Sequence, residues 1–171
     1  TGEYNQSFIE AYWLTDRVEV IGGYMRELVF AYRPGLKPLS LEETLRGLVE
    51  GELRLINRNR GSGTRVYLDY LLKPLCEAPS RRVRGYEMVA YTHSETARAV
   101  ASGRADVCLT LRHSAEVYGL KATHVTWERY EYIALKDRLK RRGVRHLREL
   151  LKSDWLLELI GSTPGYRPLS H

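Results

Sequence analysis

Apolar residues in this chain follow two different spacings. Continuous or alternating runs predict strands, and apolar positions three or four residues apart predict helices. Strands are predicted at residues 18–32, 53–56, 85–91, 106–111 and 125–135. Helices are predicted within residues 1–13 and at 40–50, 65–73, 94–101, 114–119 and 144–160. Because strands and helices alternate along the chain, we predict an α/β fold.

Several boundaries depend on particular residues. Gly22-Gly23 and then Arg26-Glu27 interrupt the apolar run at 18–32, which we interpret as two strands or one bent strand. Ser40 and Glu43 have the spacing of a capping box and begin the helix at 40–50. Residues 161–171 form a Pro/Gly-rich tail after the last predicted helix.

Residues 85–111 are predicted to form a strand, helix, strand unit in which Ser94 is the N-cap of the helix. A connection of this length places the two strands in parallel. Ligands of such open sheets bind beyond the carboxyl ends of the strands. Those ends carry side chains that can donate hydrogen bonds: Thr92, His93, Ser94, Thr110, Arg112 and His113. Taken alone, each also fits an ordinary role as a cap, a strand-end residue or an exposed polar residue.

The segment between the strand at 53–56 and the helix at 65–73 has the composition of an anion-binding loop. The first amides of a helix lack intrahelical partners and lie at the positive end of its dipole. Glycines let an anion approach the backbone, hydroxyl groups add donors, and guanidinium groups suit tetrahedral oxyanions and carboxylates. All three features are present in Arg58, Arg60, Gly61, Ser62, Gly63, Thr64 and Arg65.

A simpler interpretation of this loop stays open. Ser62 or Thr64 would only cap the helix, the glycines would only form the turn, and the arginines would be solvated. The loop lacks the Gly-Lys-Ser/Thr ending of a P-loop and the glycine spacing of a dinucleotide-binding fingerprint.

Composition is that of a globular domain with a preference for anionic partners. The 171 residues can bury the core of one domain, and 43% of them are hydrophobic. Lys and Arg number 27 against 21 Asp and Glu, which gives a net charge of +6. The sequence contains no recognised nucleic-acid-binding motif. The arginines of residues 78–84 are expected in a basic surface loop.

The cysteine content and the lengths of the apolar runs bear on metal sites and location. Cys76 and Cys108 are expected to be buried free thiols, with a single bridge between them as the alternative, and no Cys/His cluster indicates a metal site. We find no membrane-spanning run and no signal peptide, so we expect a cytoplasmic protein with no membrane contact.

Three stretches of the chain resemble one known family. They are the motif Asn57-Arg58-Asn59-Arg60-Gly61-Ser62-Gly63-Thr64-Arg65 with residues 68–72 after it, the opening Thr1-Gly2-Glu3-Tyr4-Asn5, and residues 91–93 with 99–106. Together they resemble the type II periplasmic-binding-protein-like domain of molybdate- and tungstate-related regulators and molybdopterin-biosynthesis fusion proteins.

The resemblance implies a two-lobed fold with mostly parallel sheets, in which part of the first lobe precedes Thr1. The lobes would comprise approximately residues 1–78 with 136–171, and residues 85–127. It further implies a non-catalytic sensor that closes on molybdate or tungstate, without another cofactor. Its partner would be a DNA-binding or molybdopterin-biosynthesis domain outside this chain, and a homo-oligomer is compatible with it.

Other functions remain as alternatives. Tyr67, Tyr86 and Tyr91 would allow an organic anion such as a carboxylate or a pterin to stack. An acyl or phosphoryl transferase using Ser62 and His93 is a weaker hypothesis, because no nucleophile elbow or paired carboxylates accompany these residues. The domain could also have lost its ligand and act as an assembly surface.

Overall fold

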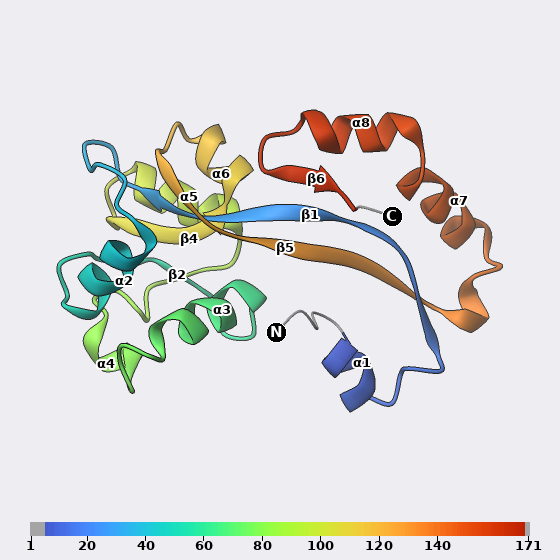
Figure 1. Ribbon diagram of the computed structural model, residues 1–171, viewed down its shortest axis with the longest axis horizontal. Coiled ribbons are helices and arrows are strands. Elements are labelled where there is room, and N and C mark those ends of the chain that lie inside the picture. Colours follow the sequence, from blue (N-terminus) through green and yellow to red (C-terminus); the bar gives the residue numbers. More distant parts are fainter. Residues whose placement is uncertain (1–5, 170–171) are drawn as a thin grey trace. The chain divides into compact units, whose positions relative to one another are not determined.

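The computed structural model describes residues 6–169 (Figure 1). The opening residues Thr1–Asn5, which contribute to the family resemblance, lie outside the described residues. The chain divides into two compact units, Thr1–Arg26 with Trp127–His171 and Glu27–Thr126. We call them unit 1 and unit 2. Two long strands, β1 (Val18–Tyr32) and β5 (Ala122–Leu135), contribute residues to both units (Figure 1).

Unit 2 is built around a mixed set of strands. β4 (Val107–Leu111) pairs antiparallel with β1, with Leu28 opposite Leu111 and Tyr32 opposite Val107. β2 (Asn57–Arg58) pairs in parallel with β3 (Val89–Ala90), and Leu55 forms a parallel bridge to Val107. β3, the 55–58 segment and β4 therefore run in one direction, which confirms the predicted parallel strand, helix, strand unit. The α/β fold is confirmed, with sheets that combine parallel and antiparallel pairs.

Helices cover unit 2 on both faces of β1, because successive side chains of a strand point to opposite sides. Leu28, Phe30 and Tyr32 belong to one hydrophobic cluster, with α2 (Leu41–Val49) and α3 (Gly63–Leu72). Val29 and Ala31 belong to the other, with α5 (His93–Ala101) and α6 (Arg112–Val117).

The expected lobe boundaries differ from these units. We expected residues up to 78 to form one lobe and residues 85–127 the other. In unit 2 the first cluster joins Leu48, Leu55 and Leu72 to Val107 and Leu109, so residues on both sides of that boundary share one core.

Local signals set several helix ends in unit 2. The capping box of Ser40 and Glu43 is present and confirms the predicted start of α2. The N-cap of α5 is Thr92 rather than Ser94, because Glu95 completes a capping box with Thr92. The basic segment after residue 77 contains a short helix, α4 (Pro79–Arg82), where we predicted only a loop.

Unit 1 contains α1 (Gln6–Ala11), a 3-10 turn η1 (Lys136–Arg138), α7 (Arg142–Leu151), α8 (Asp154–Ser162) and β6 (Tyr166–Pro168). The single helix predicted at 144–160 is wrong, because α7 ends at Leu151 and the Ser153 side chain caps α8. The predicted tail includes β6, which pairs antiparallel with β1. None of the helices in the described part of the chain has the length and apolar character needed to cross a membrane.

Candidate functional site

The predicted anion-binding residues 58–65, here called the 58–65 loop, connect β2 to the N-terminus of α3. Ser62 is the N-cap of α3 in an extended conformation, with φ −69° and ψ 131°. Its side chain makes no capping hydrogen bond. Neither the Ser62 nor the Thr64 hydroxyl has a hydrogen-bond partner among residues 6–169. Two hydroxyl groups therefore lie at the positive end of a ten-residue helix without a hydrogen bond to the described residues.

The two glycines leave the space beside this helix end open. Gly61 has φ +84°, a left-handed conformation that favours glycine. A Cβ atom added at Gly61 or at Gly63 would have no neighbour within 4 Å. The space that side chains at these two positions would fill is therefore open beside the start of α3.

The three arginines of the loop are held differently. Arg58 donates from Nη2 to the Tyr91 carbonyl oxygen at 2.9 Å. Arg65 is buried, with a side chain 5% exposed, and donates from Nη1 to the Arg58 carbonyl oxygen at 3.2 Å. Its guanidinium lies 4.6 Å from the ring centroid of Tyr86. Arg60 has a side chain 83% exposed, so it is the arginine of this loop that can swing toward a ligand.

Sequence reasoning missed the carboxylate of Glu87, and it considered Tyr86 only as a ring on which a ligand could stack. Glu87 lies between two arginines, 3.7 Å from Arg60 Nη2 and 3.7 Å from Arg65 Nη2. The Tyr86 hydroxyl donates to Asp69 Oδ1 at 2.6 Å, which fixes the ring against Arg65. Burial, followed by this bond to Asp69, raises the pKa of Tyr86. Both residues follow the basic segment in sequence, and only parallel pairing of β2 with β3 brings them to the loop.

The second predicted loop, at the N-terminus of α5, is occupied by its own side chains. Glu95 Oε2 accepts hydrogen bonds from the amides of Tyr91 at 2.7 Å and Thr92 at 3.1 Å. Thr92 Oγ1 accepts from the Glu95 amide at 3.0 Å. Ser94 is exposed on the first turn, and the carbonyl oxygen of His93 accepts from Thr110. Three amides at this helix start, those of Tyr91, Thr92 and Glu95, are therefore already bonded to side chains of the cap.

Two further residues that we predicted to bind a ligand already have partners within unit 2. Thr110 is fully buried, and its hydroxyl donates to the His93 carbonyl oxygen at 3.1 Å. Arg112 forms a bidentate pair with Glu27, at 3.0 Å from Nε and 2.7 Å from Nη2. His113, next to it on α6, is exposed.

Glu27 is the centre of a charged cluster that sequence reasoning did not assign. Its Oε1 also lies 2.8 Å from His124 Nδ1 on β5. Burial acts to raise the pKa of Glu27, but hydrogen bonds from Arg112 and His124 outweigh it and lower this pKa. The available signal was the glutamate that directly precedes the apolar residues 28–32 of β1, since buried charges in proteins are paired.

Other kinds of site have less support. Within residues 6–169, no group of three or more His, Cys, Asp or Glu side chains is placed to hold a metal ion. Cys76 and Cys108 are both free thiols, as predicted, but Cys108 is buried whereas Cys76 is only half-buried.

One sequence relative and two solved structures show what this chain is similar to. The chain is 27% identical over 166 residues to the uncharacterized protein YvgK of Bacillus subtilis (strain 168), covering 97% of this chain and 52% of that protein. The chain thus spans about half the length of this relative. A crystal structure of a histidine kinase sensor domain with similarity to periplasmic binding proteins matches with a TM-score of 0.59 at 14% identity. The match covers 92% of this chain and 67% of that one.

A second solved structure, L-phospholactate-bound PEB3, matches with a TM-score of 0.60 at 13% identity, over 96% of this chain and 77% of that one. Identities this low show a shared fold. The sequence profile of the PBP superfamily domain matches residues 1–152, which is most of the chain. This protein therefore belongs to the family described by the PBP superfamily domain.

Proposed function

We propose that this chain is a non-catalytic ligand-binding or sensor domain that binds a small oxyanion at the 58–65 loop. The observation that carries the proposal is the contrast between two helix N-termini that follow adjacent parallel strands. The N-terminus of α5 has a capping box formed by Thr92 and Glu95, whereas the N-terminus of α3 has no side-chain cap. An anion at α3 would accept hydrogen bonds from donors of this helix end that have no acceptor among the described residues.

The donors fit an anion with several oxygens. The amides of Gly63 and Thr64 and the hydroxyls of Ser62 and Thr64 provide neutral donors at the helix end. Arg60 is exposed and adds a mobile cation, while the buried Arg65 adds a fixed positive charge beneath the loop. Glu87 is within 4 Å of both guanidiniums, so ligand binding would replace part of its interaction with them.

Molybdate and tungstate are the first ligands to test, because the 58–65 motif resembles domains that respond to them. Regulation of a DNA-binding or molybdopterin-biosynthesis partner, and a cytoplasmic location, stay predictions of the sequence. The solved neighbour PEB3 is bound to L-phospholactate, so an organic phosphate belongs in the same ligand panel.

An organic anion is the second candidate, and the position of Tyr91 favours it. Tyr91 is 72% exposed, and its carbonyl oxygen accepts a hydrogen bond from Arg58 of the loop. An aromatic ring at this position can stack on a flat ligand whose acid group binds at α3. The two candidates predict opposite orders of affinity for oxyanions and organic anions.

The absence of a base near Ser62 supports a binding role. A serine nucleophile needs a neighbouring base within hydrogen-bond distance. The Ser62 hydroxyl has no such partner in the described chain, including His93. The transferase hypothesis therefore lacks the contact on which it depends.

Isothermal titration of the protein with molybdate, tungstate, sulfate, phosphate and phospholactate tests the proposal. A Ser62→Ala, Thr64→Val variant removes both hydroxyls, and valine keeps the volume of the buried Thr64. Each lost bond to a charged group contributes about 1.5–3 kcal/mol, so affinity should fall at least ~10-fold. Ser94→Ala, which removes an exposed hydroxyl from the first turn of α5, is the matched control. Absence of saturable binding in folded protein, or equal affinities in all three proteins, would reject the site.

A further inference from the structure

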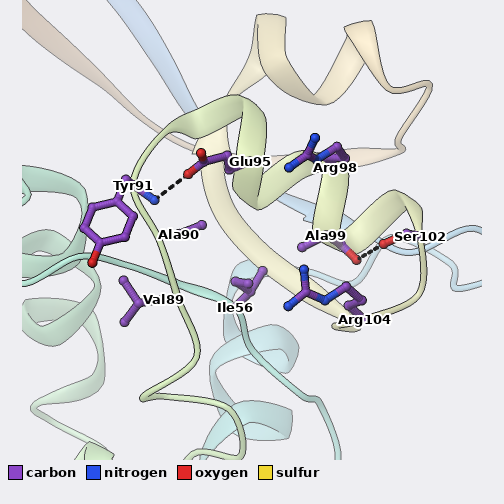
Figure 2. A pocket seen from close by; sticks show the side chains of 9 residues that line it. All are labelled: Ile56, Val89, Ala90, Tyr91, Glu95, Arg98, Ala99, Ser102 and Arg104. Carbon is purple, nitrogen blue, oxygen red and sulfur yellow. Dashed lines mark hydrogen bonds between the residues drawn. The ribbon is translucent and has the colours of Figure 1, made fainter.

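A separate pocket of about 140 Å³ lies in unit 2 beside α5 and β3 (Figure 2). It is lined by Ile56, Val89, Ala90, Tyr91, Glu95, Arg98, Ala99, Ser102 and Arg104. No residue from 57 to 65 belongs to this lining, so the pocket is distinct from the 58–65 loop.

Two arginines give the pocket its charge. Figure 2 shows the side chains of Arg98, on α5, and Arg104, after the end of α5, directed toward the same hollow. Neither guanidinium has an ion-pair or hydrogen-bond partner among residues 6–169, and both residues are exposed. Two like charges directed at one space repel each other, and a shared anion relieves that repulsion.

One carboxylate lines the pocket, but it is already bonded. Glu95 Oε2 accepts from the amides of Tyr91 and Thr92 as part of the capping box of α5 (Figure 2 draws the bond to Tyr91). With two arginines and one glutamate, the lining carries a net charge of +1. This balance suits a ligand with a single negative charge.

Part of the pocket lining belongs to the hydrophobic core. Ile56, Ala90 and Ala99 are 3%, 7% and 4% exposed and share one hydrophobic cluster. Tyr91 and Ser102 add polar atoms to the same lining. The volume of about 140 Å³ leaves room for a short hydrocarbon group beside the three core residues.

We propose that this pocket binds a small organic monocarboxylate. Its carboxylate would lie between the guanidiniums of Arg98 and Arg104, and its hydrocarbon part would contact Ile56, Ala90 and Ala99. Guanidinium groups recognise carboxylates through paired hydrogen bonds. The inference does not depend on an oxyanion at the 58–65 loop.

Titration of the full chain with benzoate and butyrate tests this inference, with benzyl alcohol and inorganic phosphate as comparison ligands. We expect saturable binding of a carboxylate that falls at least 10-fold in Arg98→Gln, Arg104→Gln. Arg81→Gln, Arg82→Gln makes the same change of charge at exposed residues of the same unit, outside the pocket lining, and should bind normally.

Amide chemical shifts locate the binding independently of any variant. Carboxylate binding should move the signals of residues 89–91 and 98–104. The inference is overturned if neither carboxylate saturates, if both arginine pairs lose binding equally, or if the shifts lie elsewhere. It is also overturned if phosphate or benzyl alcohol binds as tightly as benzoate, because the pocket would then not recognise an organic anion.

Discussion

Replacing Arg112 with methionine should lower the free energy of unfolding by more than the removal of an exposed ion pair does. Glu27 has a side chain 11% exposed, and Arg112, 23% exposed, makes two of its hydrogen bonds. Removal of one partner of a buried pair typically costs about 3–5 kcal/mol. Because Arg112 is partly solvated and His124 stays beside Glu27, we expect about 2–3 kcal/mol for Arg112→Met.

Urea unfolding, monitored by circular dichroism, measures this loss. The midpoint urea concentration should fall, while the dependence of the unfolding free energy on urea concentration stays the same. Arg46→Met is the matched control, since Arg46 pairs with Glu42 at 2.7 Å but the two side chains are 60% and 80% exposed. An exposed pair contributes at most about 1 kcal/mol. Equal losses in the two variants would refute the assignment of Glu27 as a buried, charged centre.

The same cluster should appear in the pH dependence of stability. The pKa of Glu27 is lowered in the folded protein, whereas an unfolded glutamate titrates near about 4.3. Its contribution is therefore complete above the unfolded pKa and is lost as pH falls through the folded pKa. Glu27→Gln should remove this part of the acid sensitivity. If the slope of stability against pH below about 4.3 stays the same in this variant, Glu27 is not the source of that sensitivity.

Three further changes test local structure. Thr92→Ala removes the cap of α5 and should lower the free energy of urea unfolding by about 1 kcal/mol. Ser62→Ala removes no capping bond and should lower it little. Equal losses would contradict this difference between the two helix ends. Gly85→Ala places a methyl group against the Leu55 carbonyl oxygen at a residue with φ +80°, so we expect a loss of about 3 kcal/mol, and a neutral change would refute this packing. Burial raises the pKa of the Cys108 thiol to about 12, so a thiol reagent at pH 8 should leave it unmodified until the protein unfolds, and rapid reaction in the native state would disagree.

The parts of the fold that sequence predicted well depend on local chemistry. Ser40 and Glu43 predicted the start of α2 because both halves of a capping box lie within four residues. The same local signal was present in Thr92 and Glu95, and it outweighed Ser94 because only Thr92 has a glutamate three residues later. Ser153 likewise caps the start of α8, within a stretch that apolar spacing alone predicted to be one helix.

The parts that sequence did not predict depend on contacts between distant residues. Arg112 looked available for a ligand, but it pairs with Glu27, a residue 85 positions earlier. Thr110 lies beneath α5 because its strand packs against that helix. The 58–65 loop was recognised from composition, whereas the positions of Tyr86 and Glu87 beside Arg65 follow from the parallel pairing of β2 and β3.

Amide chemical shifts during a titration with molybdate test whether the N-terminus of α3 holds the anion. We expect saturable shifts at Gly63 and Thr64, with small changes at Thr92 and Glu95, whose amides are already bonded to side chains. The same shifts should be weakened in the Ser62→Ala, Thr64→Val variant. Saturable binding of molybdate, tungstate or phosphate that leaves the Gly63 and Thr64 signals unmoved would show that the anion binds elsewhere.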